Sequence, residues 1–217
     1  MNNARPSAIV IAVDGPAASG KGTISKALAK HFDLPHMDTG LLYRAVALSL
    51  FRFGGDPGNP FEARRAVEAL EQIDMDDAEL RTETVGEIAS RVSAYPGVRT
   101  ALLERQKAFA AQDGGAVLDG RDIGTVIAPD ATAKLFVTAS PEKRAERRCA
   151  ELQGRGLDVH YEDVLIDIRA RDERDAGRES APLVQAADAD LLDTTEMTIE
   201  RAVRRAIALV EARLPAS

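Results

Sequence analysis

Residues 15–21, GPAASGK, match the G-x-x-x-x-G-K pattern of a phosphate-binding loop. The glycines let consecutive backbone N–H groups curve around phosphate oxygens, and the lysine adds a full positive charge. The alternative interpretation is a glycine-rich turn that contains a lysine by coincidence. A β-branched run precedes the segment and a helical pattern follows it, so the sequence favours the phosphate loop.

Gly22 stands directly after the lysine, where such loops usually carry a Ser or Thr that ligates Mg²⁺. The hydroxyl comes one residue later, at Thr23. Two interpretations stay open: Mg²⁺ is held through phosphates and water, or Thr23 contacts a phosphate. We expect no direct protein ligand for the metal. The chain has no Asn-Lys-x-Asp motif, which argues against a GTP switch.

A second set of charged and polar residues lies beyond the loop. It comprises Asp38-Thr39-Gly40 with Tyr43-Arg44, Ser90 with Arg99, Asp119-Gly120-Arg121-Asp122, and residues 171–178. Residues 119–122 follow an expected parallel strand, where open α/β sheets bind their ligands. Arginines at several such turns of an acidic chain indicate a site for anionic groups, because the planar guanidinium binds phosphate with two N–H groups.

In the last of these segments, Arg171, Arg174, Asp175 and Arg178 share one helical face by their i, i+3, i+4 and i+7 spacing. Taken alone, the segment is also compatible with a solvated helix in which Arg171 pairs with Asp175. The other three segments favour a binding site.

Hydrophobic periodicity predicts the elements that position these residues. Strands are expected at 9–13, 116–118, 134–138 and, more briefly, 190–193. Helices are expected at 23–32, 40–53, 61–73, 141–154, 161–175 and 198–214, with one or two more in 77–112, interrupted near Tyr95-Pro96-Gly97. Ser140 is suited to cap the helix that starts at Pro141. The alternation predicts an α/β fold with a parallel sheet flanked by helices.

Composition excludes several classes of protein. The chain has 217 residues, one cysteine and a net charge of −7. A single cysteine excludes an intrachain disulfide, and no run approaches the roughly 18–20 apolar residues of a membrane span. The acidic balance argues against a nucleic-acid or membrane-surface binder. We expect a monomeric, cytoplasmic protein without nucleic-acid or membrane partners.

Four segments, GPAASGKGT, MDTGLLYRA, LDGRDIGT and RARDERDAGRESAPL, resemble bacterial cytidylate kinases. They occur in the family's order and span residues 9–183. The resemblance implies a single P-loop kinase domain over 1–217. Its core is expected at 7–51, 84–146 and 163–217, with a helical NMP-binding insert at about 52–83 and a short lid at about 147–162. The insert looks shorter than is usual in the family, and its pattern shows helices but no convincing strands.

The resemblance also implies an activity, the transfer of the ATP γ-phosphoryl group to CMP or dCMP with Mg²⁺. The residues implied to bind ATP are Gly15, Pro16, Ala17, Ala18, Ser19, Gly20, Lys21, Gly22 and Thr23. Those implied to bind CMP are Asp38, Thr39, Tyr43, Arg44, Ser90, Arg99, Arg121, Asp122, Arg171, Asp175 and Arg178. The catalytic residues would be Lys21, Arg121, Arg174 and Arg178.

Two alternatives remain at this point. One is a related P-loop kinase that phosphorylates UMP, AMP or an alcohol; for an alcohol, Asp38, Asp119 or Asp122 would serve as the base. The other is a nucleotide-binding regulatory module with little or no ATP hydrolysis. Several arginines beyond the loop favour a kinase, because a switch needs no second phosphate site.

Overall fold

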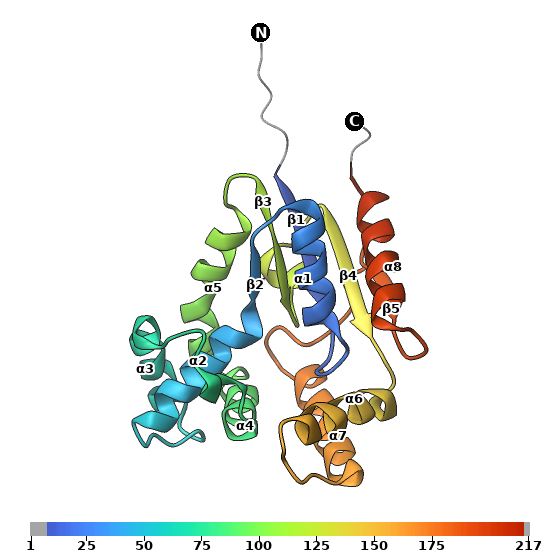
Figure 1. Ribbon diagram of the computed structural model, residues 1–217. Coiled ribbons are helices and arrows are strands. Elements are labelled where there is room, and N and C mark those ends of the chain that lie inside the picture. Colours follow the sequence, from blue (N-terminus) through green and yellow to red (C-terminus); the bar gives the residue numbers. More distant parts are fainter. Residues whose placement is uncertain (1–7, 215–217) are drawn as a thin grey trace. The chain divides into compact units, whose positions relative to one another are not determined.

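The computed structural model describes residues 8–214 (Figure 1). The strands are β1 (Ile9–Asp14), β2 (His36–Asp38), β3 (Gly115–Gly120), β4 (Ala133–Thr138) and β5 (Asp190–Asp193). The α-helices are α1 (Lys21–Phe32), α2 (Thr39–Arg52), α3 (Pro60–Ala66), α4 (Glu83–Val92), α5 (Pro96–Ala110), α6 (Pro141–Gly154), α7 (Tyr161–Ala176) and α8 (Ile199–Glu211). Two 3₁₀ helices, η1 (Val67–Gln72) and η2 (Ala78–Arg81), and one π-helix, η3 (Ile123–Ile127), complete the list. Within residues 8–214, no helix is long and apolar enough to cross a bilayer.

The strands form one sheet in the order β2-β3-β1-β4-β5. The central strand β1 runs parallel to β3 and β4, with Ile11 opposite Val117 and Val13 opposite Leu135. This confirms the parallel α/β fold and the four predicted strands. The prediction missed β2, because three residues are too few to show a period of two.

The chain divides into two compact units. The first contains residues up to Met37 and from Ala110 onward, and the second is Asp38–Phe109. The insert predicted at 52–83 falls inside the second unit, and these residues form α3, η1, η2 and turns without a strand. The finer division into core, insert and lid stays a prediction, and its positions 7 and 215–217 lie outside the described residues.

In the first unit, α1 and α8 pack on the sheet (Figure 1). Their apolar residues, such as Leu28 and Val210, join Ile11, Val13 and Leu135 in one buried core. Burial of both strand faces explains why β1 is a continuous apolar run. The two helices α6 and α7 share a second core, and Ala18 of the loop that follows β1 packs against it.

In the second unit, α2 packs against α4 and α3. The helix predicted at 61–73 begins as α3 but continues from Val67 as the 3₁₀ helix η1, so a single regular helix is wrong there. The region 77–112 forms η2, α4 and α5, and Pro96 starts α5 at the predicted interruption.

Candidate active site

The loop between β1 and α1 has the backbone of a phosphate-binding loop. Gly15 has φ +154°, and a Cβ atom there would lie 2.0 Å from the Val137 carbonyl oxygen, so only glycine fits. Ala18 and Gly20 also have positive φ, at +59° and +87°. These turns curl the chain before α1, whose first N–H groups have no partner inside the helix. The structure thus confirms the predicted strand, loop and helix, which can bind an anion at the helix N-terminus.

Lys21 is the first residue of α1, and its side chain folds back over the loop. Its Nζ donates to the Pro16 carbonyl at 3.4 Å. Thr23 is exposed on the first turn of the same helix. A charged amine and a row of main-chain donors therefore lie at one point of the fold.

The carboxylate of Asp119, near the end of β3, lies beside this loop. A Cβ on Gly22 would lie 3.9 Å from Asp119 Oδ2. The other carboxylate oxygen, Asp119 Oδ1, lies within hydrogen-bond distance of His36 Nε2, at 2.7 Å. Among the described residues, no three His, Cys, Asp or Glu side chains cluster to hold a metal. A carboxylate beside the loop fits Mg²⁺, which takes one or two carboxylates together with phosphates and water. How the metal is held stays a prediction.

Asp14, the last residue of β1, joins the loop to the segment after β3. Its carboxylate accepts backbone N–H bonds from Ile123 and Gly124, both at 2.8 Å. Burial raises the pKa of Asp14 to about 6, although these two bonds lower it. The negative charge of Asp122 also raises this pKa.

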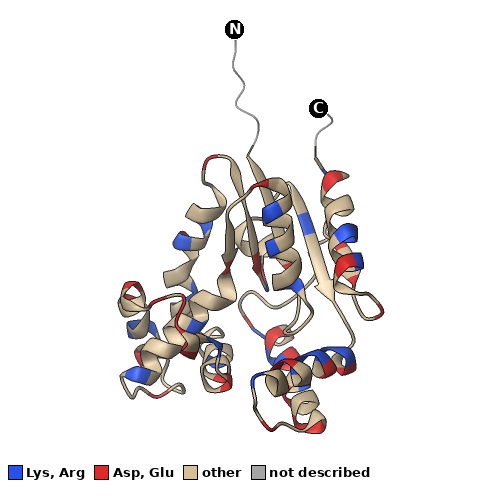
Figure 2. Cartoon of the chain, viewed as in Figure 1, with Lys and Arg blue, Asp and Glu red and all other residues tan. Residues whose placement is uncertain are grey.

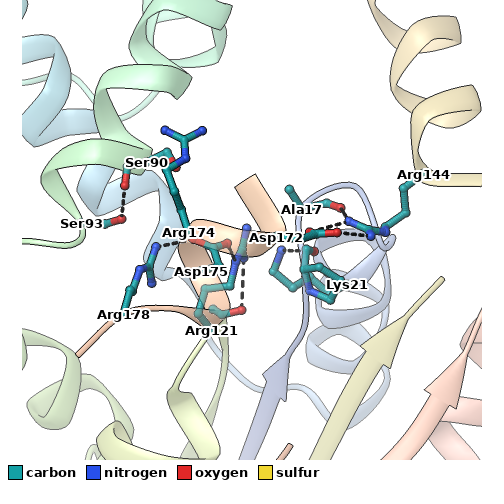
Figure 3. Close-up of polar contacts among 12 residues, drawn as sticks. Ala17, Lys21, Ser90, Ser93, Arg121, Arg144, Asp172, Arg174, Asp175 and Arg178 are labelled. Atoms are coloured by element: carbon teal, nitrogen blue, oxygen red, sulfur yellow. Dashed lines mark hydrogen bonds and ion pairs between the residues drawn. The ribbon is translucent and has the colours of Figure 1, made fainter. Parts of the chain in front are cut away.

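Asp175 joins two predicted site arginines in the first unit (Figure 3). Arg121 Nε donates to its Oδ2 at 2.7 Å, and Arg178 forms an ion pair with its Oδ1. Burial acts to raise the pKa of Asp175, but Arg121 and Arg178 outweigh it, so the pKa is lowered. The aspartate is ionised at neutral pH and keeps two guanidinium groups in place.

The predicted helical face of residues 171–178 is wrong at its end. Helix α7 stops at Ala176, and Gly177 caps it, so Arg178 lies beyond the helix yet still pairs with Asp175. Arg171 contributes to the lowered pKa of Asp175. Arg174 is exposed and donates to the Ala170 carbonyl at 3.3 Å. The alternative of a solvated helix is also wrong for Asp175, which is 1% exposed.

In the second unit, three predicted base-binding or pocket residues lie together. The Arg99 guanidinium stacks 5.9 Å from the centre of the Tyr43 ring and donates to the Ser93 carbonyl at 3.3 Å. Ser93 Oγ in turn donates to the Ser90 carbonyl at 3.0 Å. The buried Ser90 Oγ has no hydrogen-bond partner among the described residues.

Arg44, on α2, is held by the segment that precedes α4. Its Nη1 donates to the Leu80 and Thr82 carbonyls at 2.8 and 3.1 Å. A Cβ on Gly86 would lie 2.8 Å from Arg44 Nη2, so the missing side chain leaves room for the guanidinium. The sequence predicted Arg44 as a site residue. It did not indicate the two carbonyl oxygens that bind Arg44 or the space that Gly86 leaves for it.

The structure also shows the local environment of three further predicted residues, Asp38, Thr39 and Asp122. Asp38 caps α2 by accepting the Leu41 N–H at 3.2 Å, which agrees with its place at the turn into that helix. Thr39 and Asp122 are buried, at 3% and 4% exposure.

A family model described as Cytidylate kinase matches residues 11–212. The chain belongs to the cytidylate kinase family. Relatives named cytidylate kinase include one from Caulobacter sp. (strain K31), which is 56% identical over 94% of each chain. Another, from Xanthobacter autotrophicus, is 60% identical over 94% of this chain and 98% of its own.

Solved structures show the P-loop kinase fold of this cytidylate kinase family member. A gluconokinase from Sinorhizobium meliloti 1021 aligns with a TM-score of 0.51 over 96% of this chain and 94% of its own, at 16% identity. At that identity the likeness concerns the fold alone.

Sequence reasoning missed three charged residues of this cytidylate kinase family member. Asp14 and Arg144 are buried and bind the segment after β3 and the phosphate loop, and Asp172 binds Arg144, although none of the three was selected. Asp14 directly precedes the loop, which was an available hint. Nothing in the charge-rich segment 142–148 distinguishes Arg144 from its neighbours, because only packing decides which arginine is buried.

Proposed function

We propose that the protein transfers the γ-phosphoryl group of ATP to CMP or dCMP, giving ADP and CDP or dCDP. One observation carries the proposal beyond the family match. Two arginines from separate segments, Arg121 and Arg178, both bind the buried carboxylate of Asp175. Guanidinium groups gathered in one place can bind an anion, which supports an acceptor that carries its own phosphate.

The donor ATP binds at the loop of residues 15–23. Its phosphates accept main-chain N–H groups there, while Lys21 and the N-terminus of α1 supply positive charge. When bound, Mg²⁺ would supply positive charge to the phosphates. Asp119, whose Oδ2 lies 3.9 Å from a Cβ built on Gly22, would bind the metal through its water.

The arginines that bind the acceptor phosphate are Arg44, Arg121 and Arg178. Asp175 and Arg171 bind the sugar hydroxyls, and a carboxylate oxygen has lone pairs for more than one donor. Asp38, Thr39 and Tyr43 line the acceptor pocket.

Ser90, Arg99 and Asp122 bind the base. Cytosine offers an amino group at position 4 and acceptors at N3 and O2, so Asp122 accepts from the amino group and Arg99 donates to an acceptor. Uracil reverses the polarity at positions 3 and 4. Each mismatched buried polar group costs about 1–3 kcal/mol, which favours CMP over UMP.

No general base is needed, because the second pKa of a phosphate monoester is about 6 and its oxygen is already nucleophilic at pH 7. The chain's contribution is to orient the two nucleotides and to neutralise charge. Lys21, Arg121, Arg174 and Arg178 carry that role.

The remaining proposals concern state and location. The net charge of −7 and two small nucleotide substrates support a monomer in the cytoplasm that needs no nucleic acid or membrane. A lid at about 147–162 is also proposed; its first half is the end of α6, and residues 155–160 are non-helical.

A panel of acceptors tests the function. ADP release is measured with CMP, dCMP, UMP, AMP and an alcohol at saturating ATP, and Lys21→Ala serves as the control that cannot transfer. We expect CMP or dCMP to exceed UMP by about tenfold to a hundredfold in kcat/KM. Equal turnover of CMP and UMP contradicts the assigned base contacts, and ATP binding without acceptor-stimulated ADP contradicts a kinase.

A further inference from the structure

Arg144, in the first turn of α6, is a buried cation outside the predicted site. It is 2% exposed, whereas α6 and α7 otherwise carry mixed charges along their length (Figure 2). A buried guanidinium is stable only when its N–H groups find partners. The hydrogen-bond partners of Arg144 therefore show which parts of the chain this residue connects.

Four hydrogen bonds connect Arg144 to three separate segments. Its Nε donates to the Ala139 carbonyl at 2.9 Å, before the start of α6. Both terminal nitrogens bind the Asp172 carboxylate on α7, with Nη1 at 2.8 Å from Oδ1. Nη1 also donates to the Ala17 carbonyl, in the phosphate loop, at 3.2 Å (Figure 3).

The contact with Ala17 fixes a peptide plane of the loop. In a planar trans peptide, the Ala17 carbonyl and the Ala18 N–H point in opposite directions. Because the Ala17 carbonyl points toward Arg144, the Ala18 N–H points away from Arg144. Ala18 itself has φ +59°, a conformation that persists in a non-glycine residue only when its surroundings enforce it.

Neighbouring carbonyls of the loop are held in the same manner. Lys21 donates to the Pro16 carbonyl, and Thr194 Oγ donates to the Ser19 carbonyl at 3.1 Å. Arg147, one turn after Arg144 on α6, donates to Thr194 Oγ at 3.0 Å and to its carbonyl at 2.6 Å. Ala18 also packs against the core shared by α6 and α7. Helix α6 thus supports the loop through two arginines.

We propose that Arg144 is a positioning residue for ATP: it holds the Ala17 carbonyl and thereby directs the Ala18 N–H toward the phosphates. Asp172 orients the guanidinium for this contact by binding both of its terminal nitrogens. The inference rests on the proposed use of ATP as donor. It requires no contact between Arg144 and the nucleotide.

The test compares two ion pairs between the same helices. Arg144→Met removes the guanidinium, and Arg169→Met, the matched control, removes the exposed pair of Arg169 with Glu142. ATP affinity is measured by calorimetric titration without an acceptor, together with KM for each nucleotide and the melting temperature. We expect Arg144→Met to weaken ATP binding and raise the KM for ATP by about tenfold, with the KM for CMP within about twofold.

Each other outcome overturns the proposal. ATP affinity that matches the Arg169→Met control assigns Arg144 a role in stability alone, and equal rises in both KM values indicate general damage. If Arg144→Met fails to fold, the variant Arg144→Lys tests the proposal instead. It keeps the charge but cannot bind Ala17, Ala139 and Asp172 together, so ATP binding should still weaken, and unchanged affinity refutes the proposal.

The titration needs no acceptor, so it separates this inference from the proposed function. A wild-type protein that binds ATP but forms no CDP refutes the kinase activity and leaves the titration result standing. A protein that forms CDP while Arg144→Met binds ATP normally refutes only the role of Arg144.

Discussion

Asp172 and Asp175 lie three residues apart on α7, and each binds arginines from other segments. Asp172 binds Arg144, and the pair supports the phosphate loop. Asp175 binds both Arg121 and Arg178 and so brings two guanidinium groups together. Both carboxylates form ion pairs with arginines, but the two sets of ion pairs serve different purposes.

The difference shows how to distinguish a positioning pair from a binding site. A pair of one arginine and one carboxylate transmits its position to the backbone that it contacts. A carboxylate that binds two arginines gathers two guanidinium groups in one place, where an anionic ligand can bind them. On this basis we propose that Asp172 serves the donor side and Asp175 the acceptor side.

Arg178→Ala is expected to have the largest effect on this comparison. It removes one of the two guanidinium groups that bind Asp175, so kcat/KM for CMP should fall about 10²- to 10³-fold. ATP affinity should stay within about twofold, because Arg178 is proposed to bind the acceptor phosphate and not the donor. Steady-state kinetics and ATP titration measure the two quantities.

The matched control for Arg178→Ala is Arg213→Ala, which removes the exposed pair with Asp190. Exposed pairs contribute little to stability, so its kinetics should equal those of the wild type. Unchanged CMP kinetics in Arg178→Ala would remove this arginine from the acceptor site. An equal loss of ATP affinity would erase the distinction between the two carboxylates.

Gly86→Ala extends the comparison to an arginine held by carbonyl oxygens. The new methyl would displace Arg44 Nη2, which lies 2.8 Å from the added Cβ and is the end of a flexible side chain. We expect the KM for CMP to rise about tenfold. The melting temperature should not fall, because alanine is favoured over glycine inside a helix.

Gly97→Ala provides the control in α5. There the nearest atoms are those of Arg64, at 3.8 Å, which is an ordinary contact. Its kinetics should match the wild type. If Gly86→Ala also keeps its KM for CMP, the position of Arg44 does not matter for acceptor binding.

The phosphate loop was predictable because its chemistry is local. Gly15 and Gly20 adopt positive φ, and Lys21 follows directly, so the pattern of residue types fixes the geometry. The strand that ends before Arg121 was predictable for the same reason, since a buried apolar run stops at polar residues. Both features depend on neighbours in the sequence.

Features set by packing were not predictable. The spacing placed Arg178 on a helix, but α7 ends at Ala176, and the contact with Asp175 forms from beyond the helix end. Nothing local distinguishes buried Arg144 from half-buried Arg148, which pairs with Glu151 on the helix surface. Strand β2 depends on its partner β3 rather than on its three residues.

Asp14 is a third buried carboxylate, and its pKa moves opposite to that of Asp175. Two backbone N–H groups do not offset its burial, so its pKa rises from 3.8 to about 6, whereas arginines lower that of Asp175. Below pH 3.8 Asp14 is protonated in the folded and unfolded chain alike. As the pH rises toward 6, the unfolded chain releases this proton first, so Asp14 costs folding stability with increasing pH.

Asp14→Asn, which does not titrate, isolates this effect on stability. We compare the free energy of unfolding of this variant with that of the wild type at each pH. The difference, variant minus wild type, should increase by about 2 kcal/mol between pH 4.5 and pH 7, whatever its value at pH 4.5. Urea unfolding at several pH values measures the difference. A constant difference would show that Asp14 has an ordinary pKa. It would also show that two main-chain donors suffice to keep a buried carboxylate charged, as two arginines do for Asp175.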